Sequence, residues 1–95
     1  MYKVGVIGAG NIGCKRAAVA AAHPQTELAA VFDVDSERGV ALARKYGGKA
    51  ASSWREVAAA DDLDIVVAAT THDGLAEIST AALEAGKHVL CEKPM

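Results

Sequence analysis

The fold is decided by the stretch KVGVIGAGNIGCKRA, which occupies residues 3–17. It begins as a short run rich in β-branched residues, which is typical of a strand buried on both faces. Three glycines follow with the spacing Gly8-x-Gly10-x-x-Gly13, and an alanine-rich helical segment comes after them. Gly8 permits a tight bend, Gly10 lets the backbone approach a pyrophosphate, and Gly13 lets the helix pack closely on the strand. The pattern predicts a turn that binds a dinucleotide.

The residues around this turn indicate how the cofactor would be held. Backbone N–H groups at the helix start, those of Asn11 and Ile12 among them, and the positive end of the helix dipole favour phosphates. Asp33 follows about twenty positions after Gly13, where a carboxylate accepts hydrogen bonds from the adenosine ribose. Arg38 comes shortly afterwards and offers a partner for a 2′-phosphate. We expect NAD, with NADP as the alternative. The competing interpretations are packing glycines, a helix-entry role for Asp33 and a solvated Arg38.

Composition limits the classes of protein that this chain can represent. It has 95 residues, enough for one domain, and is 52% hydrophobic but only 4% aromatic, so the core is expected to consist of Ala, Val, Leu and Ile. The formal net charge of −2 lacks the excess of basic residues that is typical of nucleic-acid-binding domains. No apolar run suits a membrane span, residues 1–4 leave no room for a signal peptide, and the two cysteines fit neither a metal cluster nor a disulfide framework. We expect a cytoplasmic protein without metal, membrane or nucleic acid.

Strand-like and helix-like segments alternate along the chain. Asp35 or Ser36 can cap the second helix, Gly47 and Gly86 stop helices, and residues 71–74 form a polar loop. Ser53 and Glu56 form a predicted capping box, in which each side chain binds the other's backbone N–H. The predicted strands cover residues 3–7, 28–33, 49–51, 64–70 and 88–91, and the predicted helices cover residues 11–22, 36–46, 53–61 and 75–85.

This alternation predicts an α/β fold, a doubly wound parallel sheet of about five strands. The chain stops just after the last predicted strand. Because an uncovered strand edge is a liability, we expect the sheet to be incomplete at that edge. Residues 1–95 are therefore expected to be the N-terminal part of a larger protein.

Residues 82–94, ALEAGKHVLCEKP, together with the glycine turn and Asp33, carry a resemblance to a known family. They resemble the N-terminal Rossmann domain of the Gfo/Idh/MocA oxidoreductases, which include glucose–fructose oxidoreductase and inositol dehydrogenase. The resemblance covers the whole chain. It implies a further substrate domain that this chain lacks, and hydride transfer between nicotinamide and a hydroxyl or carbonyl of a sugar, polyol or related molecule. It also implies a homo-oligomer at full length, and an inactive chain when residues 1–95 stand alone.

The resemblance also assigns residues to the nicotinamide side of the site. Lys93 would lie near the nicotinamide and the substrate hydroxyl as the catalytic residue, in a Lys-Pro peptide that is often cis in the family. Glu92 would contact the cofactor or position Lys93, and residues 70–72, Thr-Thr-His, would line the nicotinamide. This loop departs from the family's usual Thr-Pro with a histidine four residues after the proline. Here the corresponding residues are Thr70, Thr71 and Leu75, and His72 lies earlier.

Two other functions fit parts of the pattern. One is a dinucleotide-binding module without catalysis, or a truncated remnant of an enzyme. The other is a flavin site, because Ala17 extends the glycine motif to Gly-x-Gly-x-x-Gly-x-x-x-Ala.

Overall fold

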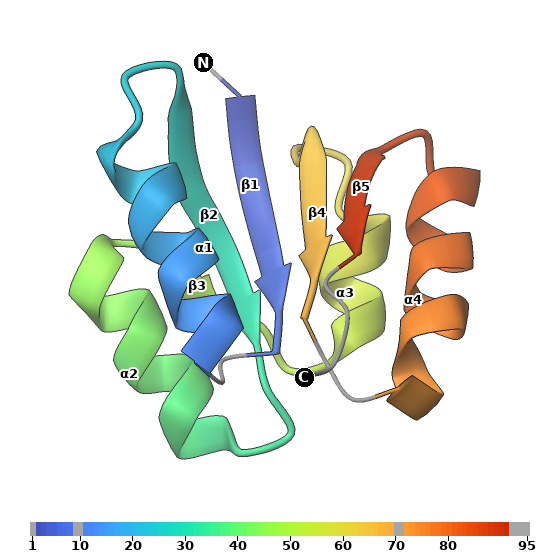
Figure 1. Cartoon of the computed structure of the whole chain (residues 1–95), viewed down its shortest axis with the longest axis horizontal. Helices are drawn as coiled ribbons and strands as arrows, with labels where there is room; N and C mark the ends of the chain where they lie inside the picture. Colours follow the sequence, from blue (N-terminus) through green and yellow to red (C-terminus); the bar gives the residue numbers. More distant parts are fainter. Residues whose placement is uncertain (1, 9–10, 70–71, 92–95) are drawn as a thin grey trace.

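The computed structural model describes residues 2–8, 11–69 and 72–91 of the chain. Strands and helices alternate along these residues (Figure 1). They are β1 (Tyr2–Ile7), α1 (Asn11–Ala22), β2 (Thr26–Phe32), α2 (Ser36–Tyr46), β3 (Lys49–Ala50), α3 (Trp54–Ala59), β4 (Ile65–Ala68), α4 (His72–Glu84) and β5 (His88–Cys91). The five strands form one parallel sheet in the order β3-β2-β1-β4-β5. The predicted doubly wound sheet is confirmed.

Helices cover both faces of the sheet, α1 and α2 on one face and α3 and α4 on the other (Figure 1). Each pair of helices closes its own apolar core against the central strands. The core under α1 and α2 contains Val4, Val6, Ala17, Ala20, Leu28, Val31, Leu42, Ala43 and Val67. The core under α3 and α4 contains Ile7, Val57, Ala58, Leu63, Val66, Ala68, Ile78 and Ala82. As the composition predicts, small aliphatic residues fill both cores.

Strand β1 contributes to both cores because side chains alternate along a strand. Val4 and Val6 belong to one core and Ile7 to the other. At Gly5 a β-carbon would lie 2.6 Å from both Leu63 Cδ1 and Val57 Cγ1. The absence of a side chain there lets α3 and the turn after it pack against the middle of β1.

A register shift between β1 and β2 allows two apolar residues of β2 to face the core under α1 and α2. Val4 pairs with Leu28 and Gly5 pairs with Ala30, so β2 has one extra residue at that point. Without such a bulge, two residues three positions apart would face opposite sides of the sheet. The bulge instead places Leu28 and Val31 in the same core.

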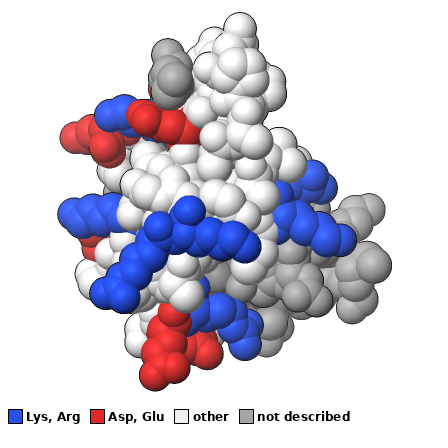
Figure 2. Space-filling model, turned by 90° about the vertical axis from the view of Figure 1, so that its left-hand side faces the viewer, with Lys and Arg blue, Asp and Glu red and all other residues white. Residues whose placement is uncertain are grey.

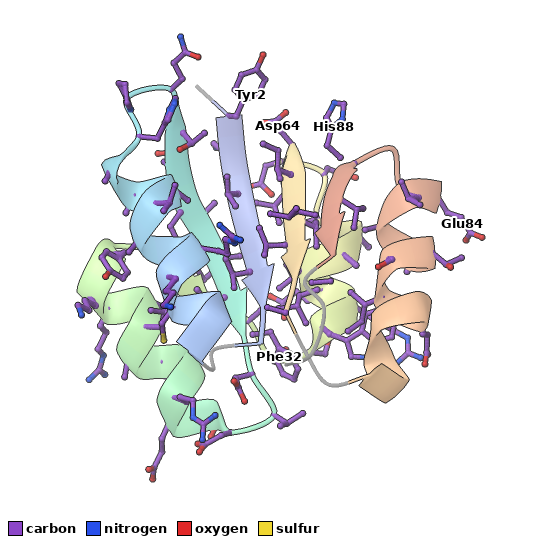
Figure 3. All side chains as sticks on the ribbon, viewed as in Figure 1. Tyr2, Phe32, Asp64, Glu84 and His88 are labelled. Atoms are coloured by element: carbon purple, nitrogen blue, oxygen red, sulfur yellow. The ribbon has the colours of Figure 1, made fainter. Side chains whose placement is uncertain are left out.

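At the amino ends of the strands, Asp64 forms hydrogen bonds to two neighbouring strands (Figure 3). Its carboxylate Oδ2 accepts a hydrogen bond from the Lys3 N–H at 2.8 Å, and its own N–H donates to the Lys3 carbonyl at 2.9 Å. The Asp64 carbonyl accepts from the His88 N–H at 3.0 Å. One residue thus joins β1, β4 and β5 at their starts.

Glycines end two of the helices as the sequence predicts. Gly47 follows α2 with φ of 84°, and Gly86 follows α4 with φ of 82°. The Lys87 N–H then donates to the Ala82 carbonyl at 3.1 Å, which closes the last turn of α4. At the start of α2 the cap is Asp35 rather than Ser36.

The predicted start of α4 is wrong by about one turn. The sequence suggested a polar loop at residues 71–74 and a helix from about Leu75, but the helix begins at His72. Gly74 does not interrupt it, because a glycine inside a helix costs only about 1 kcal/mol relative to alanine.

The predicted capping box at the start of α3 is half correct. The Ser53 hydroxyl accepts a hydrogen bond from the Glu56 N–H at 3.2 Å, as expected. The Glu56 carboxylate, however, accepts from the backbone N–H of Ser52 at 3.0 Å and from its hydroxyl at 2.7 Å. The carboxylate reaches one residue further back because Ser52 offers two donors to the same oxygen.

These contacts make the stability of the chain depend on pH through Glu56. The hydrogen bonds from Ser52, with a smaller contribution from the positive charge of Lys49, hold the pKa of Glu56 below its ordinary value of 4.5. A lowered folded-state pKa stabilises the fold above the unfolded-state pKa, and this stabilisation is lost as the pH falls through the folded-state value. We expect the stability difference between wild type and Glu56→Gln to be constant from neutral pH to about 5 and to shrink below about 4.5.

Urea unfolding followed by circular dichroism measures this difference. Glu84→Gln, at the exposed end of α4, serves as the control for loss of one carboxylate. A wild-type advantage over Glu56→Gln that persists unchanged to pH 3 would contradict the role of the Ser52 contacts.

Candidate dinucleotide-binding site

The candidate site lies where β1 and β2 end side by side. Ile7 pairs with Phe32 in the sheet, and the Gly8 N–H donates to the Phe32 carbonyl at 2.7 Å. Phe32 marks this carboxyl-terminal edge, opposite Tyr2, Asp64 and His88 (Figure 3). Gly8 follows Ile7 and Asp33 follows Phe32, and Ile7 and Phe32 are paired in the sheet. The glycine turn and the acidic residue therefore begin at the same level of adjacent strands.

The first turn of α1 lies directly on Gly8, the residue that follows β1. Gly8 has φ of 102°, a conformation that favours glycine. A β-carbon on Gly13 would lie 1.8 Å from the Gly8 carbonyl oxygen and 2.8 Å from its carbonyl carbon. No side chain fits in that space. This geometry agrees with the close helix–strand packing predicted for Gly13, and it sets the amino-terminal end of α1 at the carboxyl edge of the sheet.

Other predicted members of the phosphate-binding turn are described in part. Asn11 and Ile12 begin α1, and the structure gives their backbone positions. Their N–H groups belong to the first turn of the helix, which has no intrahelical acceptors for them. Gly10 lies outside the described residues.

Asp33 is partly buried and is held in a defined orientation. Its carboxylate Oδ1 accepts a hydrogen bond from the Asp35 N–H at 2.8 Å, the local turn that aspartate commonly makes. The capping role in α2 belongs to Asp35, whose Oδ1 accepts from the N–H groups of Glu37 at 3.1 Å and Arg38 at 3.4 Å. Asp33 therefore helps to shape the entry to α2 without capping it.

Gly39 brings α2 against the backbone of Asp33, a feature that the sequence analysis missed. A β-carbon on Gly39 would lie 3.3 Å from the Asp33 nitrogen and 3.7 Å from the Asp33 Cβ. A glycine inside a helix is a recognised signal of close packing, and its place six residues after Asp33 could have directed attention to it.

Arg38 lies in the first turns of α2 and pairs with the helix cap. Its Nε is 3.9 Å from Asp35 Oδ2, and the two side chains are 58% and 51% exposed. The sequence analysis considered Arg38 as a partner of a 2′-phosphate or as a solvated residue, but not as a partner of Asp35. Their spacing of three residues in a helix start could have predicted the pair.

The nicotinamide side of the predicted site falls largely outside the described part of the chain. The Ala69 N–H donates to the Ile7 carbonyl at 2.8 Å, so the end of β4 lies beside the end of β1 on the side away from β2. For His72 the structure describes the backbone as the first residue of α4. Thr70, Thr71, Glu92 and Lys93 lie outside the described residues, as does Pro94 with its expected cis bond.

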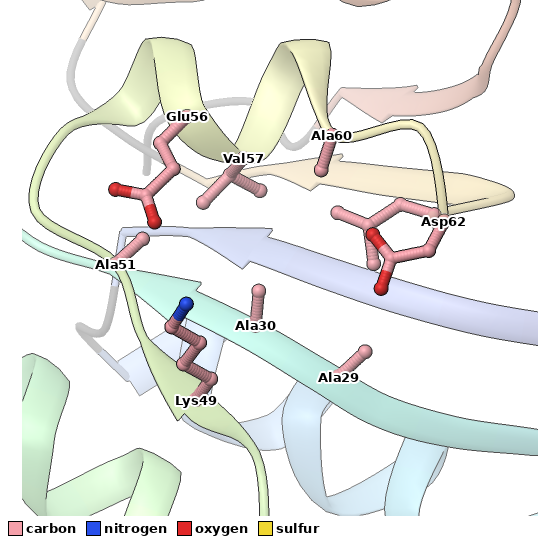
Figure 4. A pocket seen from close by; sticks show the side chains of 9 residues that line it. Ala29, Ala30, Lys49, Ala51, Glu56, Val57, Ala60 and Asp62 are labelled. Atoms are coloured by element: carbon pink, nitrogen blue, oxygen red, sulfur yellow. The ribbon is translucent and has the colours of Figure 1, made fainter.

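A hollow of about 120 Å³ occurs elsewhere, between α3 and the strands β2 and β3 (Figure 4). Lys49 and Glu56 lie near one end of it and Asp62 near the other, with alanines along its floor. It contains none of the predicted cofactor residues. Among the described residues, no group of three or more His, Cys, Asp or Glu side chains is arranged to hold a metal ion. Within the same residues, no helix has the length and apolar character needed to cross a membrane.

A parallel sheet with this strand order, a glycine turn after β1 and an acidic residue after β2 define a Rossmann-type dinucleotide-binding domain. The Gfo/Idh/MocA family model, described as an oxidoreductase family with an NAD-binding Rossmann fold, matches residues 2–95. The chain belongs to this family, which confirms the resemblance seen in its sequence.

Known relatives extend this match. The 1,5-anhydro-D-fructose reductase of Ensifer adhaerens is 38% identical over 96 residues, covering 100% of this chain and 29% of that protein. A myo-inositol dehydrogenase from Corynebacterium glutamicum superimposes with a TM-score of 0.92 at 37% identity, covering 99% of this chain and 28% of the other. Biliverdin reductase from Synechocystis sp. PCC 6803, solved with biliverdin and NADP⁺, gives a TM-score of 0.91 at 29% identity, with 97% and 29% covered. The chain thus spans less than a third of the length of these relatives.

The contact between α1 and the glycine turn predicts a large cost for a single methyl group. We expect Gly13→Ala to lower the free energy of unfolding by about 3 kcal/mol or more, because the clash is with backbone that can yield only if the helix moves. Gly86→Ala is the matched control, since nothing lies within 4 Å of its added β-carbon and only the positive φ is penalised. The control should cost about 1–2 kcal/mol. Equal urea midpoints for the two variants would show that α1 does not depend on this contact.

Proposed function

We propose that this chain binds the adenosine and pyrophosphate part of NAD or NADP. The backbone of Gly8 and the N–H groups at the start of α1 receive the pyrophosphate, with Gly10, Asn11, Ile12 and Gly13 completing the turn. The Asp33 carboxylate accepts hydrogen bonds from the ribose hydroxyls. The observation that carries this proposal is the contact of Gly13 with the Gly8 carbonyl, which places a helix amino terminus beside Asp33.

We propose NAD rather than NADP as the preferred cofactor. The Asp33 carboxylate accepts a hydrogen bond from a 2′-hydroxyl but repels a 2′-phosphate. Arg38 is the residue that would favour NADP, and it is paired with Asp35 instead. The family's NAD-binding description and the NADP⁺ in the biliverdin reductase structure show that both cofactors occur among relatives.

For the whole protein we propose an oxidoreductase that transfers hydride between nicotinamide and a hydroxyl or carbonyl of a sugar or polyol. The names of the reductase and dehydrogenase relatives support this substrate class. Lys93 holds the substrate hydroxyl and assists the transfer of its proton, with Glu92 positioning the lysine. Residues 70–72 line the nicotinamide. The protein is completed by a C-terminal substrate domain, acts as a homo-oligomer and resides in the cytoplasm.

Binding tests the first part of the proposal. After circular dichroism shows that the chain is folded, calorimetric titration with NAD⁺ and NADP⁺ should show tighter binding of NAD⁺. Asp33→Ala should weaken NAD⁺ binding about 10- to 150-fold, because a hydrogen bond to a charged group contributes roughly 1.5–3 kcal/mol. Asp62→Ala removes an exposed carboxylate remote from the glycine turn and should have no effect. The absence of binding by a folded chain, or equal effects of the two variants, would contradict the proposal.

Catalysis tests the second part and requires the protein with its substrate domain. With sugars and polyols as substrates, we expect Lys93→Met to lower kcat about 10²- to 10⁴-fold through loss of proton transfer. Lys45→Met, at the exposed end of α2, is the control for loss of one ammonium group. Cofactor binding by the complete protein without turnover of any such substrate would instead favour a non-catalytic dinucleotide-binding module.

A further inference from the structure

Three residues at the start of α2 form a connected unit next to the proposed ribose site. The Asp35 N–H holds the Asp33 carboxylate at 2.8 Å, and the Asp35 carboxylate caps the helix while pairing with Arg38. Acidic and basic side chains lie side by side where α2 begins, at the lower end of the face shown in Figure 2. Asp35 therefore contacts both Asp33, which is proposed to favour NAD, and Arg38, which would favour NADP.

Gly39 keeps this unit close to the site. Because a β-carbon at Gly39 would lie 3.3 Å from the Asp33 nitrogen, the first turns of α2 lie against the backbone of Asp33. Arg38 precedes Gly39, so it belongs to the part of the helix nearest to Asp33. It is also the one basic residue between Asp33 and Arg44 in the sequence. A 2′-phosphate bound at the Asp33 end of the sheet would have Arg38 as its nearest cation along α2.

Two effects of Asp35 oppose a 2′-phosphate. Its carboxylate adds negative charge beside that of Asp33, and like charges repel the dianionic phosphate. Its Oδ2 also lies 3.9 Å from Arg38 Nε, and this attraction competes with a charge-assisted hydrogen bond from the guanidinium to phosphate. Neither effect acts on a 2′-hydroxyl, which carries no charge.

We propose that Asp35 is a positioning residue that makes the site select a cofactor with a free ribose 2′-hydroxyl, by restraining Arg38 and adding negative charge beside Asp33. This inference rests on the proposed dinucleotide site. It assigns selectivity to a residue that the sequence marks only as a helix cap. In this arrangement the preference for NAD is shared between Asp33, which accepts from the hydroxyl, and Asp35, which acts through Arg38.

The test is the Asp35→Asn variant, which removes the charge but retains an oxygen that caps α2. The ratio of the dissociation constants for NAD⁺ and NADP⁺ is measured by calorimetry on the folded chain. We expect NADP⁺ to gain about two- to fivefold relative to NAD⁺, the range that exposed charge pairs support. The gain should decrease in high salt, because the charges are exposed.

Two further variants separate the pair from charge in general. Glu37→Gln removes another carboxylate from the same helix turn without removing the Asp35–Arg38 pair, and should change the ratio less than Asp35→Asn does. In an Arg38→Met background, the effect of Asp35→Asn should fall to the level of Glu37→Gln. A purely structural role of Asp35 would change the affinities for NAD⁺ and NADP⁺ alike and leave the ratio unchanged.

The outcomes distinguish this inference from the function on which it rests. If wild type binds NAD⁺ and Asp35→Asn leaves the ratio unchanged or equal to that of Glu37→Gln, the role of Asp35 is overturned and the site stands. If folded wild type binds neither NAD⁺ nor NADP⁺, the proposed function fails, and the inference fails with it.

Discussion

The structure depends on the absence of a side chain at Gly13. The helix that follows β1 lies so close to the end of that strand that an added β-carbon would lie 1.8 Å from the Gly8 carbonyl oxygen. This contact fixes where α1 starts and directs its first N–H groups toward the carboxyl edge of the sheet. The pairing of Ile7 with Phe32 then brings Asp33 to the same edge. A packing constraint between two glycines thus creates the geometry that a dinucleotide requires.

The same principle of close approach recurs where helices meet the sheet. Gly5 admits Leu63 and Val57 against the middle of β1, and Gly39 admits α2 against Asp33. Alanines occupy buried positions in both cores, so the helices can lie near the strands with few large side chains between them. At the carboxyl edge of the sheet, the proposed site consists of backbone groups that are fixed by packing and of the Asp33 carboxylate, which accepts a hydrogen bond from the Asp35 N–H.

Most of the fold could be predicted from the sequence, because its elements are separated by strong local signals. The bounds of α1 and β5 agree with prediction, since a glycine turn and His23-Pro24 enclose the first and Gly86 precedes the second. The predicted start of α4 and the predicted capping box were wrong or half correct, because glycine occurs both in turns and inside helices and because two adjacent serines could bind Glu56. Gly74 suggested a turn but lies inside α4. The Glu56 carboxylate accepts hydrogen bonds from Ser52 and not from the backbone of the adjacent Ser53. At the carboxyl edge of the sheet, Gly13 packs on Gly8 and Asp33 follows the strand that pairs with β1, as the sequence suggests, while cofactor binding by these residues stays a prediction. The Asp35–Arg38 pair is local to the start of α2 and could have been predicted from its spacing. The contact at Gly39 depends on how α2 packs on β2, which sequence spacing alone does not specify.

Strand β1 is shared by the two cores, and this sharing affects how a bound ligand would stabilise the domain. Val4 and Val6 anchor one face and Ile7 anchors the other, and the glycine turn is the direct continuation of this strand. A ligand held by the turn is therefore linked thermodynamically to both halves of the molecule. Its binding free energy adds to the cooperative stability of the entire domain, in proportion to the logarithm of ligand concentration, and does not merely stiffen a loop. In a domain of 95 residues, cofactor and fold would support each other through this one strand.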